Sequence, residues 1–245
     1  ELLLYRSYND QEITPNLNAL INKDTFAFSN YYHQVGAGSS SDAEFVSLNS
    51  LYPVNPGNAY DLYDQNSFFG LPWILREHGY STYAYHGNSG SFWNRERIYP
   101  QLGFQTSVFA DQYVLGESIG FGLDDHDFFA QTVTLMGDQE SPWFSFLITM
   151  TSHKPFRIPA EYQQLNVYPD DENLFGHYLQ AVNYADHALG EFIAALQAAD
   201  LYDNALLVIY GDHHGIGTED KEALASMETF IGGPYISAKM FKVPL

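Results

Sequence analysis

The chain has 245 residues, of which 45% are hydrophobic and 16% aromatic, so it can bury a full core and has the length of one large α/β domain. Its 30 acidic and 10 basic residues give a formal net charge of -20. This charge disfavours duplex nucleic acid and is repelled by an anionic bilayer. The absence of cysteine excludes disulfides, zinc–thiolate sites and thiol nucleophiles. No apolar run approaches the roughly 20 residues that span a membrane, and no signal peptide is visible.

The N-terminal part predicts two helices with an aromatic strand between them. The first helix starts at Thr14-Pro15, with Thr as N-cap and Pro at the first helical position. The run 26–32 (FAFSNYY) suits a strand. A Gly/Ser turn at 36–41 then leads into the second helix. The residues expected to face inward from the two helices are Leu17, Leu20, Ile21, Phe45, Leu48 and Leu51.

The serines at the start of this second helix are candidate nucleophiles. Ser39, Ser40 and Ser41 lie where the unpaired N–H groups and the positive dipole end of a helix favour an alkoxide or a bound phosphate. The alternative is an ordinary N-cap serine followed by an acidic first turn, and locally this alternative is the better supported one.

The next stretch predicts a strand that delivers a histidine at its carboxyl end. A helix over 71–78 stops at Gly79, and a strand over 80–85 is followed by His86 and Asn88. Nearby, Trp93 offers a flat aromatic wall and Arg95 a guanidinium able to grip a phosphate with two hydrogen bonds. Taken one at a time, core packing for Trp93 and a surface salt bridge for Arg95 are the simpler interpretations.

The middle of the chain predicts a further strand and two helices. Residues 105–125 look like loop and indicate no chemistry. A helix over 127–136 precedes a buried strand at 143–149, after which His153 follows closely. A long amphipathic helix covers 174–199, and its Asp186 and His187 are expected at the surface. Another helix is expected over 219–230.

The stretch 206–215 (LLVIYGDHHG) combines a strand with potential metal ligands. Its five apolar or aromatic residues predict a strand buried on both faces. Asp212 and His213 follow, flanked by glycines that let the backbone turn both side chains toward one ion. A metal site and a solvated polar turn explain this local pattern equally well.

The alternation of strands and helices predicts an α/β fold with a central, mostly parallel sheet and helices on both faces. Three predicted strands end in His86, His153 and Asp212-His213. Because ligands bind beyond the carboxyl ends of the strands in such sheets, these residues and the Gly/Ser turn are expected to converge on one edge.

These residues carry a resemblance to a known family. The matching stretches occur in the family's order and are Glu12 to Leu17, Tyr32 to Phe45, Asn49 to Tyr52, His86 to Asn88, Phe92 to Arg95, Thr149 to Phe156 and Leu201 to Gly215. The sequence resembles the extracellular catalytic domain of the lipoteichoic acid synthase group, phosphoglycerol transferases of the sulfatase and alkaline phosphatase superfamily. The resemblance implies that fold for one catalytic domain spanning 1–245.

The resemblance also implies roles for individual residues. Ser40 takes the place of the family's threonine nucleophile, and it is also expected to be a metal ligand. Asp212 and His213 match metal ligands, with Mn²⁺ the usual ion in this branch and Mg²⁺ or Zn²⁺ the alternatives. His214 is expected beside the ligands rather than among them. The residues that match the surroundings of the phosphoglycerol group are His86, Asn88, Trp93, Arg95 and His153, with Asn88 standing where relatives can have aspartate; Arg95 and His153 are also expected to be catalytic.

The family's pattern extends beyond both ends of this sequence. It places a metal-binding glutamate a few residues before Glu1, with Glu1 itself a poor substitute, and further core strands after Leu245. It also implies transmembrane helices upstream, which would hold the domain on the extracellular or periplasmic side of the cell membrane.

The function implied is metal-dependent transfer of a glycerophosphate group from a phosphatidylglycerol-type lipid to a polymer or glycan acceptor, through a covalent intermediate on Ser40. Phosphoethanolamine transfer and phosphodiester hydrolysis use the same groups and stay open. A non-catalytic module that binds a phosphoglycerol polymer is the alternative from another class. Sulfate ester hydrolysis is not expected, because Ser40 lacks the Cys/Ser-x-Pro-x-Arg surroundings of formylglycine enzymes.

Overall fold

The computed structural model describes residues 2–22, 24–114, 116 and 118–245. It divides into two compact units, each described by itself below. The first comprises residues 1–33, 117–130 and 150–245, and the second comprises residues 34–116 and 131–149. Compactness alone does not make a unit an independent domain, so the single-domain organisation stays a prediction.

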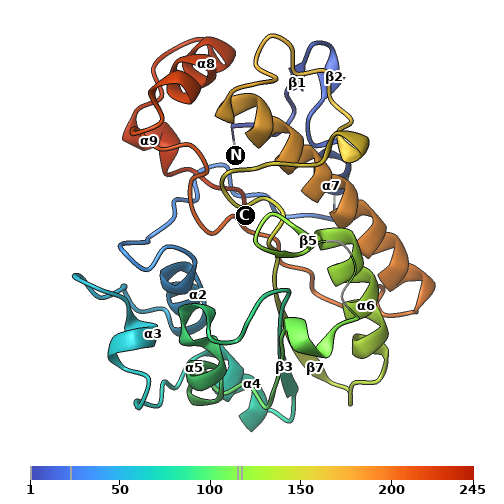
Figure 1. Cartoon of the computed structure of the whole chain (residues 1–245). Helices are drawn as coiled ribbons and strands as arrows, with labels where there is room; N and C mark the ends of the chain where they lie inside the picture. Colours follow the sequence, from blue (N-terminus) through green and yellow to red (C-terminus); the bar gives the residue numbers. More distant parts are fainter. Residues whose placement is uncertain (1, 23, 115, 117) are drawn as a thin grey trace. The chain divides into compact units, whose positions relative to one another are not determined.

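The second unit is built on a three-stranded parallel sheet (Figure 1). The central strand β3 (Ser81–His86) lies between β4 (Thr106–Val108) and β7 (Trp143–Ile148). In the register of β3 and β7, His86 pairs with Ile148, so both strands end at the same edge. The predicted strands at 80–85 and 143–149 are therefore confirmed, and the structure shows that they are neighbours in the sheet.

Short helices surround this sheet. They are α2 (Ser40–Asn49), α3 (Ala59–Leu62), α4 (Leu71–Glu77), α5 (Arg95–Leu102) and the 3-10 turns Phe92–Asn94 and Ala110–Gln112. Soon after α4 the chain turns at Gly79, and Gly103 follows the last residue of α5; both have a positive φ that glycine adopts without steric cost. The core of the unit is Phe45, Leu48, Ala59, Tyr60, Ala84, Ile98, Tyr99, Leu102 and Phe104.

The first unit is mainly helical. Its helices are α1 (Pro15–Leu20), α7 (Leu174–Ala198), α8 (Lys221–Ile231), α9 (Ser237–Met240) and the 3-10 turn Ala160–Tyr162; α6 (Asp125–Gly137) runs from this unit into the other. Two small antiparallel pairs accompany them, β1 (Ser7–Tyr8) with β2 (Gln11–Glu12) and β5 (Ser118–Ile119) with β6 (Gly122–Leu123). The long helix α7 begins at an N-cap, Asn173, whose side chain accepts the N–H groups of Phe175 and Gly176. Its buried face, with Leu179 fully buried, contributes to the core of this unit.

One residue of α7 corrects a prediction about exposure. Asp186 was expected at the surface, but it is only 4% exposed. Its carboxylate accepts the backbone N–H groups of Asn16 (2.9 Å) and Leu17 (2.7 Å), together with the side-chain amide of Asn16 (2.9 Å). Asp186 therefore satisfies the N-terminus of α1 from a different helix, which a periodicity argument on α7 alone does not reveal.

Two predicted strands are wrong. Residues 206–210 have no ladder partner among the described residues, and Leu206 and Val208 are 91% and 61% exposed. Residues 26–32 contain only an isolated bridge, from Tyr32 to Lys242. Two smaller expectations also fail, since Leu51 is 51% exposed rather than inward-facing and the region 105–125 contains the strands β4, β5 and β6.

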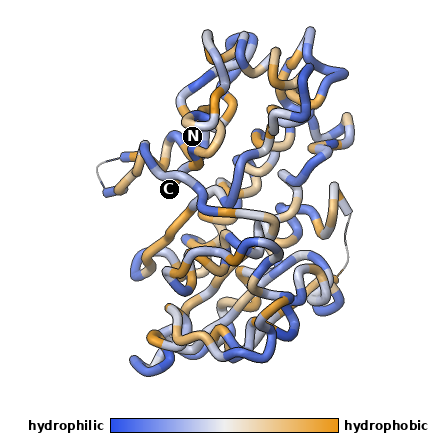
Figure 2. The backbone as a smooth tube through the Cα atoms, turned by 90° about the vertical axis from the view of Figure 1, so that its left-hand side faces the viewer, coloured by the Kyte–Doolittle hydropathy of each residue, from blue (hydrophilic) through white to orange (hydrophobic). Residues whose placement is uncertain are grey.

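No described helix has both the length and the apolar character that crossing a bilayer requires. Figure 2 shows hydrophilic and hydrophobic residues interspersed along the backbone.

Candidate active site

The turn before α2 distinguishes among the three candidate serines. Ser41 is 1% exposed, and its hydroxyl donates to the carbonyl oxygen of Gly38 at 2.7 Å. Ser39 and Ser40 are both partly exposed. Ser39 has a strained, positive φ of 44°, and Ser40 is the first residue of the helix. The hydroxyl of Ser41 is therefore buried and used in a structural hydrogen bond. Ser40 lies at the helix N-terminus, as the sequence predicted.

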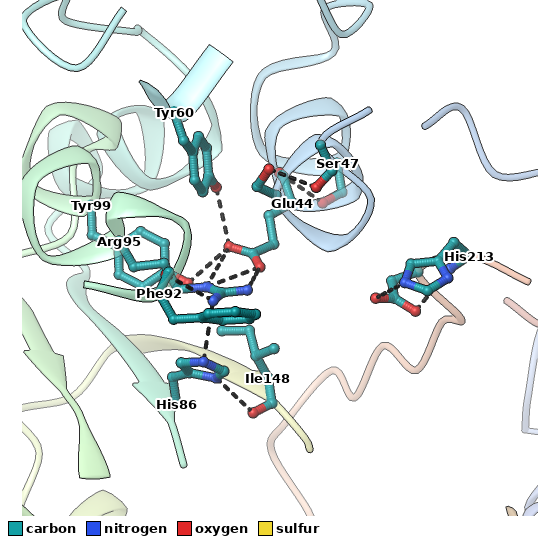
Figure 3. A network of polar contacts seen from close by, with 12 residues as sticks. Glu44, Ser47, Tyr60, His86, Phe92, Arg95, Tyr99, Ile148 and His213 are labelled. Carbon is teal, nitrogen blue, oxygen red and sulfur yellow. Dashed lines mark hydrogen bonds and ion pairs between the residues drawn. The ribbon is translucent and has the colours of Figure 1, made fainter. Parts of the chain in front are cut away.

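Arg95 forms a buried ion pair with Glu44 (Figure 3). The Nη2 atom of Arg95 lies 2.5 Å from Oε1 of Glu44, with both side chains almost completely buried. The hydroxyls of Tyr60 (3.2 Å) and Tyr99 (2.8 Å) also donate to Glu44. Burial disfavours the charged guanidinium, but the carboxylate of Glu44 outweighs this and raises the pKa of Arg95. The simpler sequence interpretation, an exposed salt bridge, is therefore wrong about exposure, and contact between Arg95 and a phosphate stays a prediction.

His86 is held in one tautomer by the same network. Nη1 of Arg95 donates to Nε2 of His86 at 3.2 Å, so the ring proton lies on Nδ1, which faces the carbonyl oxygen of Ile148 at 3.4 Å. The ring is fully buried. Burial and the charge of Arg95 lower the pKa of His86 to about 3, so this imidazole is neutral at physiological pH. In this geometry His86 supports the end of β3 from within the core, and direct contact with substrate stays a prediction.

The buried His86 predicts a pH dependence of folding stability. Unfolded histidine binds its proton near pH 6.5 and folded His86 only near pH 3, so protonation favours the unfolded chain. This contribution to stability is complete above pH 6.5 and is lost as the pH falls toward 3. Between pH 6.5 and 5.5, the free energy of unfolding measured with urea should therefore fall by about 1 kcal/mol more in the wild type than in His86→Gln. Glutamine keeps a donor and an acceptor at this position but does not titrate. Equal losses in the two proteins would contradict the neutral, buried imidazole.

Trp93 and Asn88 lie on the loop between β3 and α5. Trp93 has a left-handed backbone (φ 56°, ψ 26°) and packs partly exposed against the core of the second unit. Non-glycine residues in this conformation are strained, and such strain clusters at functional sites. Asn88 accepts the backbone N–H of Ser89 on its side-chain oxygen at 2.6 Å, and its own carbonyl accepts from Ala110. The predicted roles of both residues in substrate binding stay predictions.

Asp212 and His213 of the first unit fit a metal ion. Oδ1 of Asp212 accepts the backbone N–H of His213 at 2.8 Å, and Nδ1 of His213 faces the carbonyl oxygen of His214 at 2.9 Å. A carbonyl only accepts, so Nδ1 carries the ring proton and Nε2 is the basic nitrogen. Nε2 and Oδ2 of Asp212 lie 3.5 Å apart, close to the ~3.4 Å that separates two ligands at ~2.1 Å from one tetrahedral ion. Within the described ranges no three His, Cys, Asp or Glu residues gather into a metal-binding group, so this pair supplies only part of a coordination shell.

A pair of imidazoles, His33 and His214, lies next to Asp212 and His213. Nε2 of His33 lies 3.0 Å from Nδ1 of His214, and the two rings stack with their centroids 5.1 Å apart. Burial, with a smaller effect of His214, lowers the pKa of His33 to about 4, and burial followed by His213 lowers the pKa of His214. The ring of His33 is therefore neutral at physiological pH. That His214 stands beside metal ligands rather than among them stays a prediction.

His153, also in the first unit, has the same hydrogen-bond pattern as His213, with Nδ1 facing a backbone carbonyl oxygen. Its Nδ1 faces the carbonyl oxygen of Lys154 at 2.7 Å, which leaves Nε2 as the basic nitrogen. The ring contacts Phe121, with centroids 4.5 Å apart. Next to it, the ammonium group of Lys154 pairs with Asp220 at 2.7 Å. A partly exposed imidazole with a fixed tautomer is suited to proton transfer.

Of the predicted site residues, the structure brings His86 and Arg95 into contact and sets Asp212 beside His213. Sequence reasoning did not single out Asp42, Glu44 or His33. All three belong to the stretch 32–45 that matched the family. The signal for Asp42 and Glu44 was their position two and four residues after Ser40, within the first turns of α2. Nothing in the sequence indicated that His33 contacts the ring of His214.

Comparison with known proteins identifies the family. The sulfatase family model matches residues 5–236, so the chain belongs to the sulfatase family. The fold is that of alkaline phosphatases and sulfatases, as solved structures with the same architecture show, and the predicted fold class is confirmed.

Within this family the chain is similar to lipoteichoic acid synthases. It is 34% identical to lipoteichoic acid synthase 1 of Bacillus subtilis (strain 168) over 97% of this chain and 38% of that protein. It is 35% identical to the lipoteichoic acid synthase of Staphylococcus aureus (strain USA300) over 97% of this chain and 37% of that protein. The crystal structure of the lipoteichoic acid synthase LtaP from Listeria monocytogenes superposes with a TM-score of 0.91 at 28% identity, covering 99% of this chain and 60% of that one. The chain thus spans less than two fifths of the curated relatives that it matches.

Proposed function

We propose that this chain is part of a phosphoglycerol transferase, which moves a glycerophosphate group from a phosphatidylglycerol-type lipid to a polymer or glycan acceptor through a covalent intermediate on Ser40. The observation that carries the proposal is the position of Ser40 as the first residue of α2, after a strained turn, in a chain of the sulfatase family. The names of the similar proteins, lipoteichoic acid synthases, support the choice of substrate.

The first half-reaction transfers the group to the protein. Oγ of Ser40 gives its proton to solvent water and attacks phosphorus, and the bond from phosphorus to the diacylglycerol oxygen breaks. Nε2 of protonated His153 gives a proton to that leaving oxygen. In the second half-reaction an acceptor hydroxyl attacks the same phosphorus and gives its proton to His153. The bond from phosphorus to Ser40 breaks, and Oγ of Ser40 takes a proton from solvent water.

Asp212, His213 and Ser40 are the residues that would hold a divalent cation, for which we propose Mn²⁺, with Mg²⁺ or Zn²⁺ as alternatives. When bound, such a cation lowers the pKa of a hydroxyl and neutralises negative charge on a phosphate. The fixed tautomer of His213 and its 3.5 Å separation from Asp212 support this assignment.

The remaining residues orient the phosphoglycerol group. Arg95 carries a positive charge and contacts His86, the last residue of β3. We propose that this charge stabilises the negative charge that develops on the phosphate oxygens during the reaction. Trp93 offers a ring face to the glycerol carbons. His86 and Asn88 complete the pocket for the headgroup, His86 by holding Arg95 at 3.2 Å.

The reaction takes place at the outer face of the cell membrane in this proposal. A lipid donor requires access to a bilayer, while the net charge of -20 repels an anionic surface. A membrane segment upstream of this sequence would overcome that repulsion by tethering the domain.

Mass spectrometry of the full-length protein tests the proposal. After incubation with phosphatidylglycerol and Mn²⁺, a glycerophosphate adduct is expected on the peptide that contains Ser40, and it should be absent from Ser40→Ala and His213→Ala. Phosphatidylethanolamine serves as the competing donor. An adduct of phosphoethanolamine instead would move the assignment to that headgroup, and no adduct with either lipid, with Mn²⁺ binding verified, would favour a binding module.

A further inference from the structure

The loop before Ser40 is tied down by a single buried carboxylate. Asp42 is fully buried, and its Oδ2 accepts the backbone N–H groups of both Gly36 and Gly38 at 2.9 Å. Next to it, the hydroxyl of Ser41 donates to the carbonyl oxygen of Gly38. Two side chains of the first turn of α2 therefore hold the loop from which that helix starts.

The second oxygen of Asp42 has no hydrogen-bond partner. Oδ1 is buried and faces Gly38, where an added Cβ atom would lie only 2.3 Å away. A buried carboxylate with one unsatisfied oxygen is costly, and such a group in a native structure calls for an explanation. Glycine at position 38 is required for this close approach.

The loop held in this way contains the strained residue next to Ser40. Ser39 has φ 44° and ψ -117°, a conformation that serine avoids unless its surroundings impose it. The bonds from Asp42 and Ser41 fix Gly36 and Gly38 on one side of Ser39, and α2 fixes the other side. The direction in which Ser40 leaves the turn is thereby determined.

We propose that Asp42 is a positioning residue for the nucleophile, which acts by holding the Gly36–Gly38 backbone so that the hydroxyl of Ser40 faces the reacting phosphorus. This inference rests on the proposed function, because it assigns a cause to the orientation of the proposed nucleophile. Asp42 itself touches neither substrate nor cation in this role.

The test compares Asp42 with a carboxylate of the same kind elsewhere. Asp186 is also buried and also accepts two backbone N–H groups, but it stabilises α1, which carries none of the proposed site residues. Full-length Asp42→Ala, Asp42→Asn, Asp186→Ala and Ser40→Ala are assayed for diacylglycerol release from phosphatidylglycerol with Mn²⁺, and their melting temperatures are measured.

Asp42→Ala is expected to lower kcat about a hundredfold with KM changed less than about twofold, because displacing a nucleophile by ~1 Å has an effect of this size. Asp42→Asn, which retains one acceptor oxygen, should lose about tenfold. Asp186→Ala should lower the melting temperature comparably but keep kcat per folded molecule. Equal kcat in the Asp42 and Asp186 variants would overturn the positioning role while leaving the proposed function intact. Full activity of Ser40→Ala, or no turnover by the wild type, would overturn both.

Discussion

Replacement of Ser40 by alanine is expected to lower the rate of diacylglycerol release from phosphatidylglycerol by about a thousandfold to a millionfold, the range seen when a covalent nucleophile is removed. Alanine has no oxygen to form the bond to phosphorus, and it is a strong helix former at the first position of α2. Replacement by threonine should keep the rate within roughly tenfold, since threonine carries the same hydroxyl and only adds a methyl group.

The measurement is the initial rate with fluorescent phosphatidylglycerol in vesicles that also contain the full-length protein and Mn²⁺. Ser47→Ala is the matched control, because Ser47 lies on the same helix and its hydroxyl donates to the carbonyl oxygen of Glu44 one turn earlier. A Ser40→Ala protein that retains more than about a tenth of the wild-type rate would refute the nucleophile assignment.

Replacement of Arg95 by alanine is expected to reduce the free energy of unfolding by about 3–5 kcal/mol, the cost of leaving one partner of a buried ion pair alone. The change strands the carboxylate of Glu44, which is 3% exposed, among the rings of Tyr60 and Tyr99. Burial and the charge of Glu44 raise the pKa of both tyrosines, so their hydroxyls stay protonated and donate to Glu44. Two neutral hydroxyls do not replace the positive charge of Arg95 that balances the carboxylate.

Urea unfolding at neutral pH measures this effect. The double variant Glu44→Leu/Arg95→Met should be more stable than Arg95→Ala, because it removes both charges and keeps apolar volume in their place. Arg97→Ala is the control, since Arg97 pairs with Asp64 at an exposed position. A loss below about 1 kcal/mol for Arg95→Ala would mean that solvent reaches Glu44.

The helices were predictable because their signals are local. Thr14-Pro15 opens α1, Gly79 follows α4, and the apolar spacing of residues 174–199 defines α7. The helix α5 was not predicted. The strands β3 and β7 were found for a similar reason, as each is a short apolar or aromatic run bounded by turn residues.

The strand predicted at 206–210 failed because a strand is defined by its partners. Five apolar residues in a row indicate burial only where neighbouring strands cover them, and Leu206 and Val208 are largely exposed. The aromatic run at 26–32 failed for the same reason, with Phe26 90% exposed.

The contacts within the candidate site depended on long-range pairing. Arg95 and Glu44 are separated by 51 residues, and His33 and His214 by 181. Residue types and spacing placed Ser40 and His86 at the ends of elements, but no local pattern specifies which side chain a buried guanidinium or imidazole meets.

The left-handed backbone at Ser39 has a consequence for how this protein tolerates change. Glycine would adopt that conformation more easily than serine, so the residue beside the proposed nucleophile is one where a substitution can stabilise the fold. Glycine would also loosen the peptide that leads to Ser40. Selection for thermal stability alone is therefore expected to act against catalytic rate at this position, which makes residue 39 a poor target for consensus-type stabilisation.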